Sequence, residues 1–187
     1  MLRQSRILKT VALAMGLSLL APISAMAQAT PNAAILVVDF QRLVDDSLAG
    51  KDAKAQIADY MAKVKAREQQ LKDKLVTDAE NLQKQRSILK EEDFNRRAVE
   101  FDQSRQRAAT ELENKQVTAQ RAARQAESEI LRLARPIVRN LMQKRKANMV
   151  IPKNVAFDMK ESLDVTTKVL EELNREVPKL KVALPET

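Results

Sequence analysis

The stretch from Gly50 to about Lys146 constrains the fold more than any other part of this 187-residue chain. It holds a single proline, Pro136, and is rich in Ala, Lys, Arg, Glu, Gln and Leu, which are strong helix formers. Apolar residues recur along it at alternating spacings of three and four, as in a heptad seam. The clearest seam positions are Ile57, Met61, Val64, Leu71, Leu75, Leu82 and Leu89, then Phe94, Ala98, Phe101, Ala108, Leu112 and Ala119. The pattern predicts long amphipathic helices.

A turn is expected in the middle of this stretch, because one unbroken helix would be about 145 Å long at 1.5 Å per residue. The first seam ends near residues 87–90, and acidic residues follow at 91–93, where they favour the positive start of a new helix. A connection of that length can join antiparallel helices. We therefore predict a hairpin arm over 51–146, with helices over about 51–86 and 91–146. Polar side chains on the seam predict flexible arms, and Pro136 predicts a kink.

The two ends of the chain predict a small body with short strands. Residues 34–38 are apolar on both faces of an extended chain, which is typical of a fully buried strand. Residues 148–151 and 154–158 flank Pro152-Lys153 and predict a short β-hairpin. Three short strands bury little apolar area, so we expect a barrel assembled between chains. The expected fold is mostly α with a small β body, from which long antiparallel helical hairpin arms project.

The C-terminal part predicts one more helix and a tail. Asp164 is placed to cap an amphipathic helix in which Val165, Val169, Leu170 and Leu173 share a face, and which ends before Pro178. We expect residues 179–187 to be loose. The body then comprises residues 28–50 and 147–178.

The first 27 residues carry the three parts of a secretory signal peptide in order. A basic start is followed by an apolar run over 11–20 and by Ala25-Met26-Ala27, whose small residues suit a signal peptidase. The apolar run is too short to span a bilayer. We expect cleavage after Ala27 or Ala29 and export of the rest, with a retained anchor as the alternative.

The composition argues against an enzyme or a metal protein. The chain has no Cys and no His, so it offers neither disulfides nor the commonest general base and metal ligand. Beyond residue 27 its only glycine is Gly50, and no phosphate loop, nucleophile elbow or paired-carboxylate cleft is evident. We expect no catalytic residues, no metal and no cofactor.

The positive charge lies in the predicted arm. The chain holds 33 Lys and Arg against 25 Asp and Glu, and residues 51–147 alone hold 23 against 15. Such a surface attracts nucleic acid, anionic membranes or acidic proteins. Export and the lack of stacking aromatics argue against nucleic acid. Interleaved charges also simply solvate a long helix.

Four short motifs, in order, resemble the Skp (OmpH-like) periplasmic chaperones. They are Ile35-Leu36-Val37-Val38-Asp39, Ser47-Leu48-Ala49-Gly50-Lys51, Val155-Ala156-Phe157 and Asp164-Val165-Thr166, with the helical hairpin between the second and the third. The resemblance implies a periplasmic homotrimer whose arms surround a cavity. That cavity would hold unfolded outer-membrane β-barrel proteins without ATP.

The resemblance also directs attention to two sets of residues. We expect client binding on the distal arm, at Lys84, Arg86, Ile88, Leu89, Phe94, Arg96, Arg97 and Phe101. We expect assembly through Ile35, Val37, Met149, Val155 and Phe157. Packing within the hairpin tip is the alternative role of Phe94 and Phe101, and plain solvation that of the four basic residues. Two other functions stay open: a structural coiled coil of the envelope, and a binder of anionic membrane surfaces or lipopolysaccharide.

Overall fold

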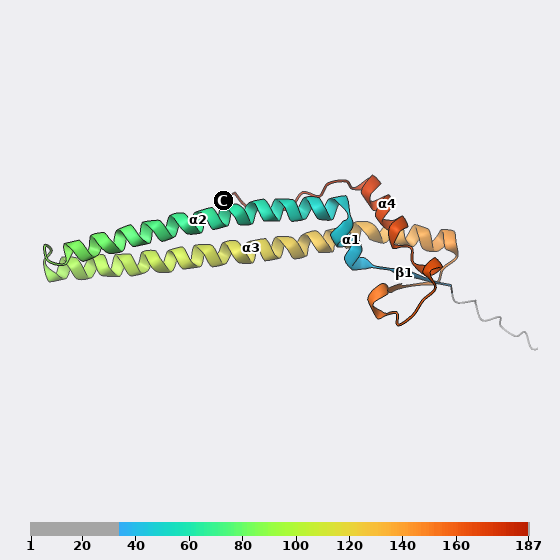
Figure 1. The fold of residues 1–187 in the computed structure, drawn as a ribbon, viewed down its shortest axis with the longest axis horizontal. Helices are drawn as coiled ribbons and strands as arrows, with labels where there is room; N and C mark the ends of the chain where they lie inside the picture. The colour runs from blue at the N-terminus through green and yellow to red at the C-terminus, as the bar shows by residue number, and fades with distance from the viewer. Residues whose placement is uncertain (1–33, 187) are drawn as a thin grey trace, which may run out of the picture. The chain divides into compact units, whose positions relative to one another are not determined.

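The structure is a computed structural model that describes residues 34–186, so the predicted signal peptide lies outside the described residues. Figure 1 shows a long helical hairpin joined to a small body. In chain order the elements are β1 (Ile35–Val38), α1 (Phe40–Asp46), α2 (Leu48–Gln85), α3 (Glu91–Arg145), β2 (Met149–Pro152), 3₁₀ turns at Lys153–Val155 and Glu161–Leu163, and α4 (Thr166–Glu176).

The hairpin formed by α2 and α3 confirms the predicted arm and the position of its turn. Three acidic residues lie in the first turn of α3, where they stabilise its positive end. At the other end Lys146 adopts a left-handed conformation with φ 52°, which ends the helix. Pro136 lies inside α3 and does not end it.

A close approach of α1 to α2 explains the Ser47–Gly50 motif. Ser47 is fully buried and caps α2, since its hydroxyl accepts a hydrogen bond from Gly50 N at 3.0 Å. A Cβ at Gly50 would lie only 1.8 Å from the carbonyl oxygen of Val44 in α1. Only glycine therefore fits where the two helices meet.

The arm is packed near the body and open towards its tip. Near the body, α2 buries Ala53, Tyr60 and Val64 against a row of alanines on α3: Ala119, Ala122 and Ala126. Residues 65–107, all of which the structure describes, include no buried residue. The distal part of the arm is thus a two-helix pair without a closed core, as its polar seam predicts.

The body is built on a parallel strand pair. β1 pairs with β2 from Ile35 opposite Met149 to Val38 opposite Pro152. On the opposite edge of β1, Val165 N donates to Val37 O at 2.9 Å. β1 is buried as predicted, but the predicted hairpin of strands is wrong. Pro152 ends β2, and the chain turns away instead of pairing with itself, because β2 takes its partner from the N-terminal end.

The last helix packs as predicted. Val165, Val169 and Leu173 are fully buried in the main core, which also contains Leu43 of α1 and Ile130 of α3. Asp164 supports the helix start, since its Oδ1 accepts hydrogen bonds from the amide and the hydroxyl of Thr166 at 2.9 and 2.5 Å.

The expectation of a loose tail is wrong for the residues that follow α4. Val182 is buried, and Leu180 and Leu184 are partly buried against α2 and α3. The tail backbone is held by hydrogen bonds: the carboxylate of Asp52 accepts from Leu180 N, and the side chain of Gln56 donates to Leu180 O and accepts from Val182 N. The tail runs back along α2 (Figure 1), so its apolar side chains find an apolar surface that lies far away in the sequence.

Candidate functional site

The tip of the arm brings the predicted client-binding residues together from both helices. The guanidinium of Arg86 lies over the ring of Phe94, 5.8 Å from its centre. Arg97 of α3 donates to the side chain of Gln85 in α2 at 2.6 Å, and Arg96 pairs with Asp93 at 2.7 Å. Basic side chains thus contribute to the closure of the tip, and several are engaged within it.

A shallow groove of about 570 Å³ runs along the tip between the two helices. Arg96, Arg97 and Phe101 line it from α3, facing Leu82 and Gln85 of α2. Phe94, Phe101 and Leu89 are half-buried, which fits partial packing within the hairpin. Ile88 is 78% exposed at the turn, while Lys84 and Arg86 are exposed beside it.

The structure adds apolar residues that the sequence analysis did not select for binding. A groove of about 520 Å³ in the middle of the arm has mainly apolar walls, formed by Leu71, Leu75, Val76, Ala79, Ala108 and Leu112. Val76 is 51% exposed, and Val99 further towards the tip is 56% exposed. Neither valine lies on the heptad seam, and that position off the seam is the signal that could have marked them as exposed.

The predicted assembly residues divide into two groups. Val37 is fully buried within the single chain and Ile35 is half-buried. Met149, Val155 and Phe157 are exposed large apolar side chains on β2 and the loop after it. Within residues 34–186 the sheet has two strands, and β2 pairs only with β1. The exposed apolar group therefore adjoins a strand edge that this chain leaves free.

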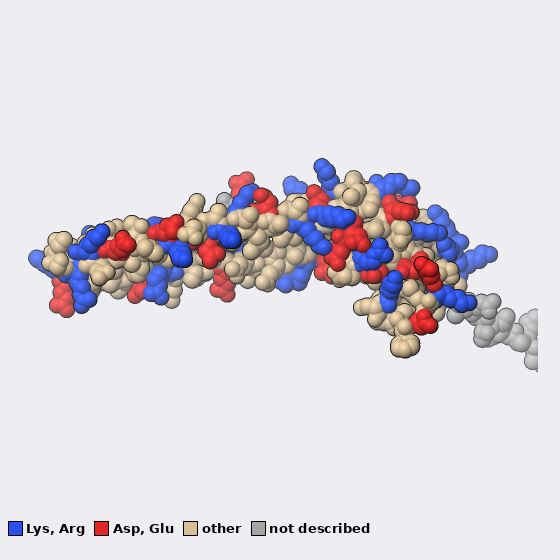
Figure 2. Space-filling model, in the orientation of Figure 1, with Lys and Arg blue, Asp and Glu red and all other residues tan. Residues whose placement is uncertain are grey.

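The densest positive charge lies near the body instead of at the tip. Residues 121–146 hold eight Lys or Arg against two Asp or Glu. Five exposed arginines fall on one face of α3 at helical spacing: Arg121, Arg124, Arg132, Arg135 and Arg139. In this segment, which the structure describes in full, Arg132 pairs with Glu129 and no other ion pair forms. Figure 2 shows many basic side chains around the body end of the molecule.

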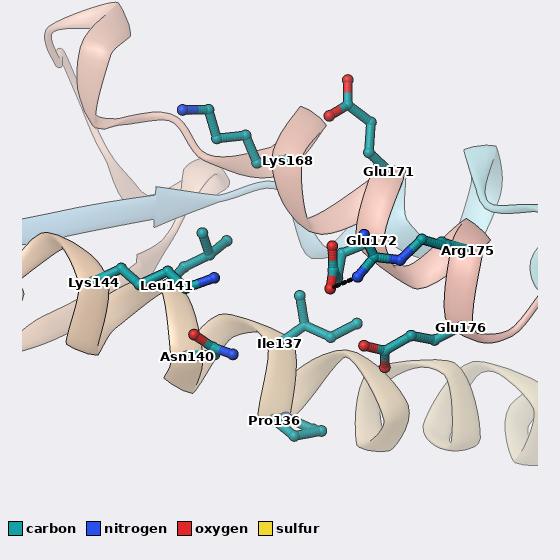
Figure 3. A pocket seen from close by; sticks show the side chains of 10 residues that line it. All are labelled: Pro136, Ile137, Asn140, Leu141, Lys144, Lys168, Glu171, Glu172, Arg175 and Glu176. Carbon is teal, nitrogen blue, oxygen red and sulfur yellow. Dashed lines mark hydrogen bonds and ion pairs between the residues drawn. The ribbon is translucent and has the colours of Figure 1, made fainter.

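A smaller pocket of about 460 Å³ lies between α3 and α4 (Figure 3). Ile137 and Leu141 form its apolar floor, and an ion pair between Glu172 and Arg175 crosses its α4 side. Acidic and basic side chains mix around its rim, so the pocket has no clear preference for one charge.

Two further properties concern residues 34–186 alone. Their helices include none that is both long and apolar enough to cross a membrane. Their Asp and Glu side chains form no cluster of three or more that could hold a metal ion.

Comparison with known proteins gives one family and one fold. The family model described as outer membrane protein (OmpH-like) matches residues 34–173. Among solved structures, the chain is similar to an OmpH-like protein of Caulobacter crescentus CB15, for which a role as an outer-membrane chaperone has been suggested. The TM-score is 0.75 at 15% sequence identity, over 83% of this chain and 92% of that one. No curated protein sequence matches the chain.

Proposed function

The chain belongs to the outer membrane protein (OmpH-like) family, and from this premise we propose that it is a periplasmic holdase chaperone. It would be exported by its N-terminal signal peptide, which would then be removed. It would hold unfolded outer-membrane β-barrel proteins in a cavity between helical arms. Holding would be passive, because an exported protein has no supply of ATP, and no catalytic step is needed.

One observation carries this proposal: the distal arm exposes apolar side chains to water, and these side chains do not pack into a core. Residues 65–107 bury none of their side chains, yet Val76, Ile88 and Val99 are more than half exposed. Val76 also borders the mainly apolar groove in the middle of the arm, and apolar surface gathered in one place typically marks an interaction surface. An open two-helix arm can also bend, which suits clients of different size.

Assembly into a homotrimer is the second part of the proposal. Met149, Val155 and Phe157 expose apolar area next to the unpaired edge of β2. Exposed strand edges and large apolar side chains are normally covered. Three copies that pair these edges would form a small closed barrel and place the arms around one cavity.

The test is retention of an unfolded barrel protein after dilution from urea, followed by light scattering. We expect the wild-type chain to suppress aggregation without ATP, through many weak contacts that add together. Replacing Val76, Ile88 and Val99 together with Ser should lower the retained client several-fold, while each single change has a small effect. The matched control replaces the exposed Ala55, Ala58 and Ala62 of α2 with Ser. Equal retention by both triple variants would contradict the assignment of the distal arm.

The basic face of α3 favours a second candidate function, binding to anionic membrane surfaces or lipopolysaccharide. Five arginines on one helix face present a charge pattern suited to phosphate headgroups. Reversal of Arg121, Arg124, Arg135 and Arg139 to Glu should abolish cosedimentation with anionic vesicles at low salt. Unchanged cosedimentation would remove this candidate and leave the chaperone proposal intact.

A further inference from the structure

The tail after α4, residues 179–186, lies in a trough on the arm and resembles a bound peptide. The trough is formed by the part of α2 and α3 that includes Ala53, Gln56 and Ala122. Burial alternates along it: Leu180 and Leu184 are half-buried, Val182 is buried, and Lys181 and Ala183 between them are exposed. This segment lies beyond the region that the family model matches, which ends at residue 173. The arm residues that form the trough lie within the matched region, and the tail that fills it lies outside.

The trough holds the tail through its main chain. Asp52 Oδ2 accepts a hydrogen bond from Leu180 N at 3.1 Å. The side-chain amide of Gln56 donates to Leu180 O at 2.7 Å and accepts from Val182 N at 3.1 Å. Gln56 also donates to Asp52 at 2.9 Å, which fixes the orientation of both side chains. Contacts of this kind hold a backbone and do not select a particular sequence.

The apolar side chains of the tail fill spaces left by small residues of the arm. Val182 packs in a cluster with Ala53, Ala122 and Ala126, where α2 and α3 meet. Leu184 packs against a second cluster further along, which includes Tyr60 and Ala119. Alternate residues of a segment in this trough therefore meet apolar surface, and the residues between them meet water.

Open space continues beside the tail. A groove of about 750 Å³ is lined by Leu184 and Pro185 of the tail and by Tyr60, Lys63, Arg67 and Gln70 of α2. The trough can therefore accommodate more chain than the tail places in it, and its walls there are apolar in part and of mixed charge, since Asp59 and Glu186 also line the groove.

We propose that this trough is a binding site for extended polypeptide in which apolar and polar residues alternate, and that the tail occupies it as an internal substitute. The occupant in trans is a segment of an unfolded β-barrel protein, so the inference rests on the proposed function. Strands of such barrels alternate apolar and polar residues with a period of two, which is the pattern of Leu180, Val182 and Leu184. A tethered tail competes at high effective concentration, so a client with several such segments displaces it more readily than a single segment does.

The experiment compares two full-length variants that introduce the same charge at adjacent residues. Val182→Asp places a carboxylate in the buried position and should release the tail, whereas Ala183→Asp places it in water and should not. The probe is a fluorescein-labelled octapeptide with the sequence of residues 179–186, followed by anisotropy. We expect the peptide to bind Val182→Asp roughly tenfold more tightly than wild type or Ala183→Asp. This factor corresponds to a tail that fills the trough in about nine of ten wild-type molecules and leaves about one in ten open to the peptide. If Val182→Asp does not fold, a chain ended after Pro178 takes its place.

Two further probes and one further substitution decide what the trough selects. An unrelated octapeptide that alternates Val with Thr and Lys should compete with the tail peptide, and a rearranged tail peptide with contiguous apolar residues should not. Adding Gln56→Ala to Val182→Asp should abolish binding of the tail peptide. Adding Gln83→Ala, which changes an exposed glutamine elsewhere on α2, should leave that binding unchanged. Equal binding of the tail peptide by wild type, Val182→Asp and Ala183→Asp would overturn the proposal. Binding of the tail peptide without the unrelated one would also overturn it and indicate a site for the tail of a second copy.

A client assay separates failure of this site from failure of the proposed function. Retention of an unfolded barrel protein that is unchanged by Gln56→Ala, with peptide binding lost, would overturn the trough as a client site and leave the chaperone function standing. A wild-type chain that retains no client would reject the proposed function and, with it, the client assignment of the trough.

Discussion

Arg67 of α2 and Glu111 of α3 form a two-pronged ion pair across the hairpin. Arg67 Nε lies 2.8 Å from Glu111 Oε1, and Nη2 lies 3.3 Å from Oε2. The hydrogen bond from Arg67 lowers the pKa of Glu111, so the carboxylate stays charged. Arg67 lies one turn beyond Val64, the buried residue of α2 nearest the tip, and Glu111 lies one turn closer to the body than Ala108, the buried residue of α3 nearest the tip. The pair therefore lies where the packed part of the arm gives way to the open part.

Removing this pair should loosen the tip more than it destabilises the fold. Arg67→Ala should broaden the distance between spin labels on cysteines introduced at exposed Gln83 and Asn95, since the chain has no cysteine of its own. Both partners are partly exposed, so solvent screens the pair and its loss should change the free energy of unfolding little. The exchanged pair Arg67→Glu with Glu111→Arg should restore the narrow distribution.

The control is Arg105→Ala, which removes an ion pair made within α3 to Asp102. An equal broadening in this variant would contradict a special role for the pair across the hairpin.

Gly50→Ala should destabilise the body. The new methyl group would meet the carbonyl oxygen of Val44, and α1 would have to move away from α2. Such overpacking costs about 1–3 kcal/mol, and the closeness of the clash predicts the upper end. Urea unfolding followed by circular dichroism measures the loss. A variant within 0.5 kcal/mol of wild type, on the order of ordinary surface changes, would contradict this account.

Asp164 should make the body sensitive to acid. Partial burial raises its pKa, but hydrogen bonds from Lys153 and Thr166 outweigh burial and lower it from 3.8 to about 2. Because the folded pKa lies below the unfolded one, the stabilisation is present above pH 3.8 and is lost as the pH falls to about 2. Asp164→Asn should therefore be less stable at pH 6 by about 1 kcal/mol after allowance for solvent screening, with the difference shrinking at low pH.

The matched control for this prediction is Glu161→Gln, an exposed acid in the same loop. Its stability should follow that of wild type across the whole range. A pH-independent difference between Asp164→Asn and wild type would contradict the electrostatic account.

Charges placed on the exposed apolar group of the body should prevent assembly. If the chain forms the proposed trimer, Val155→Asp combined with Phe157→Asp should give a monomer in analytical ultracentrifugation, since burial of two unpaired carboxylates is unfavourable. Asn154→Asp adds a charge at an exposed position of the same loop and should leave assembly unchanged. A trimer that persists in the double variant would place the interface elsewhere.

The sequence predicted the elements that depend on neighbouring residues. The turn after Gln85, the start of α3 at its acidic residues and the buried strand β1 all follow from local signals of periodicity, charge and β-branching. The prediction of the apolar face of α4 was also correct, because Val165, Val169 and Leu173 have a helical spacing.

The features that the sequence did not predict depend on contacts between distant residues. β2 pairs in parallel with β1, more than 110 residues earlier, whereas local signals around Pro152 favoured a hairpin. The tail carries an alternating pattern at Leu180, Val182 and Leu184, but no local signal shows that Gln56 holds its backbone. The predicted client-binding residues lie together at the tip, and their role stays a prediction. Val76 and Val99 were not selected, although their position off the seam indicates exposure.

The most direct test of the central claim is native mass spectrometry of residues 28–187, alone and with an outer-membrane barrel protein diluted from urea. Our account predicts a trimer that binds one unfolded client and keeps it in solution as a 3:1 complex. A monomer or dimer that leaves the client to precipitate would contradict it and would favour a structural coiled coil of the envelope.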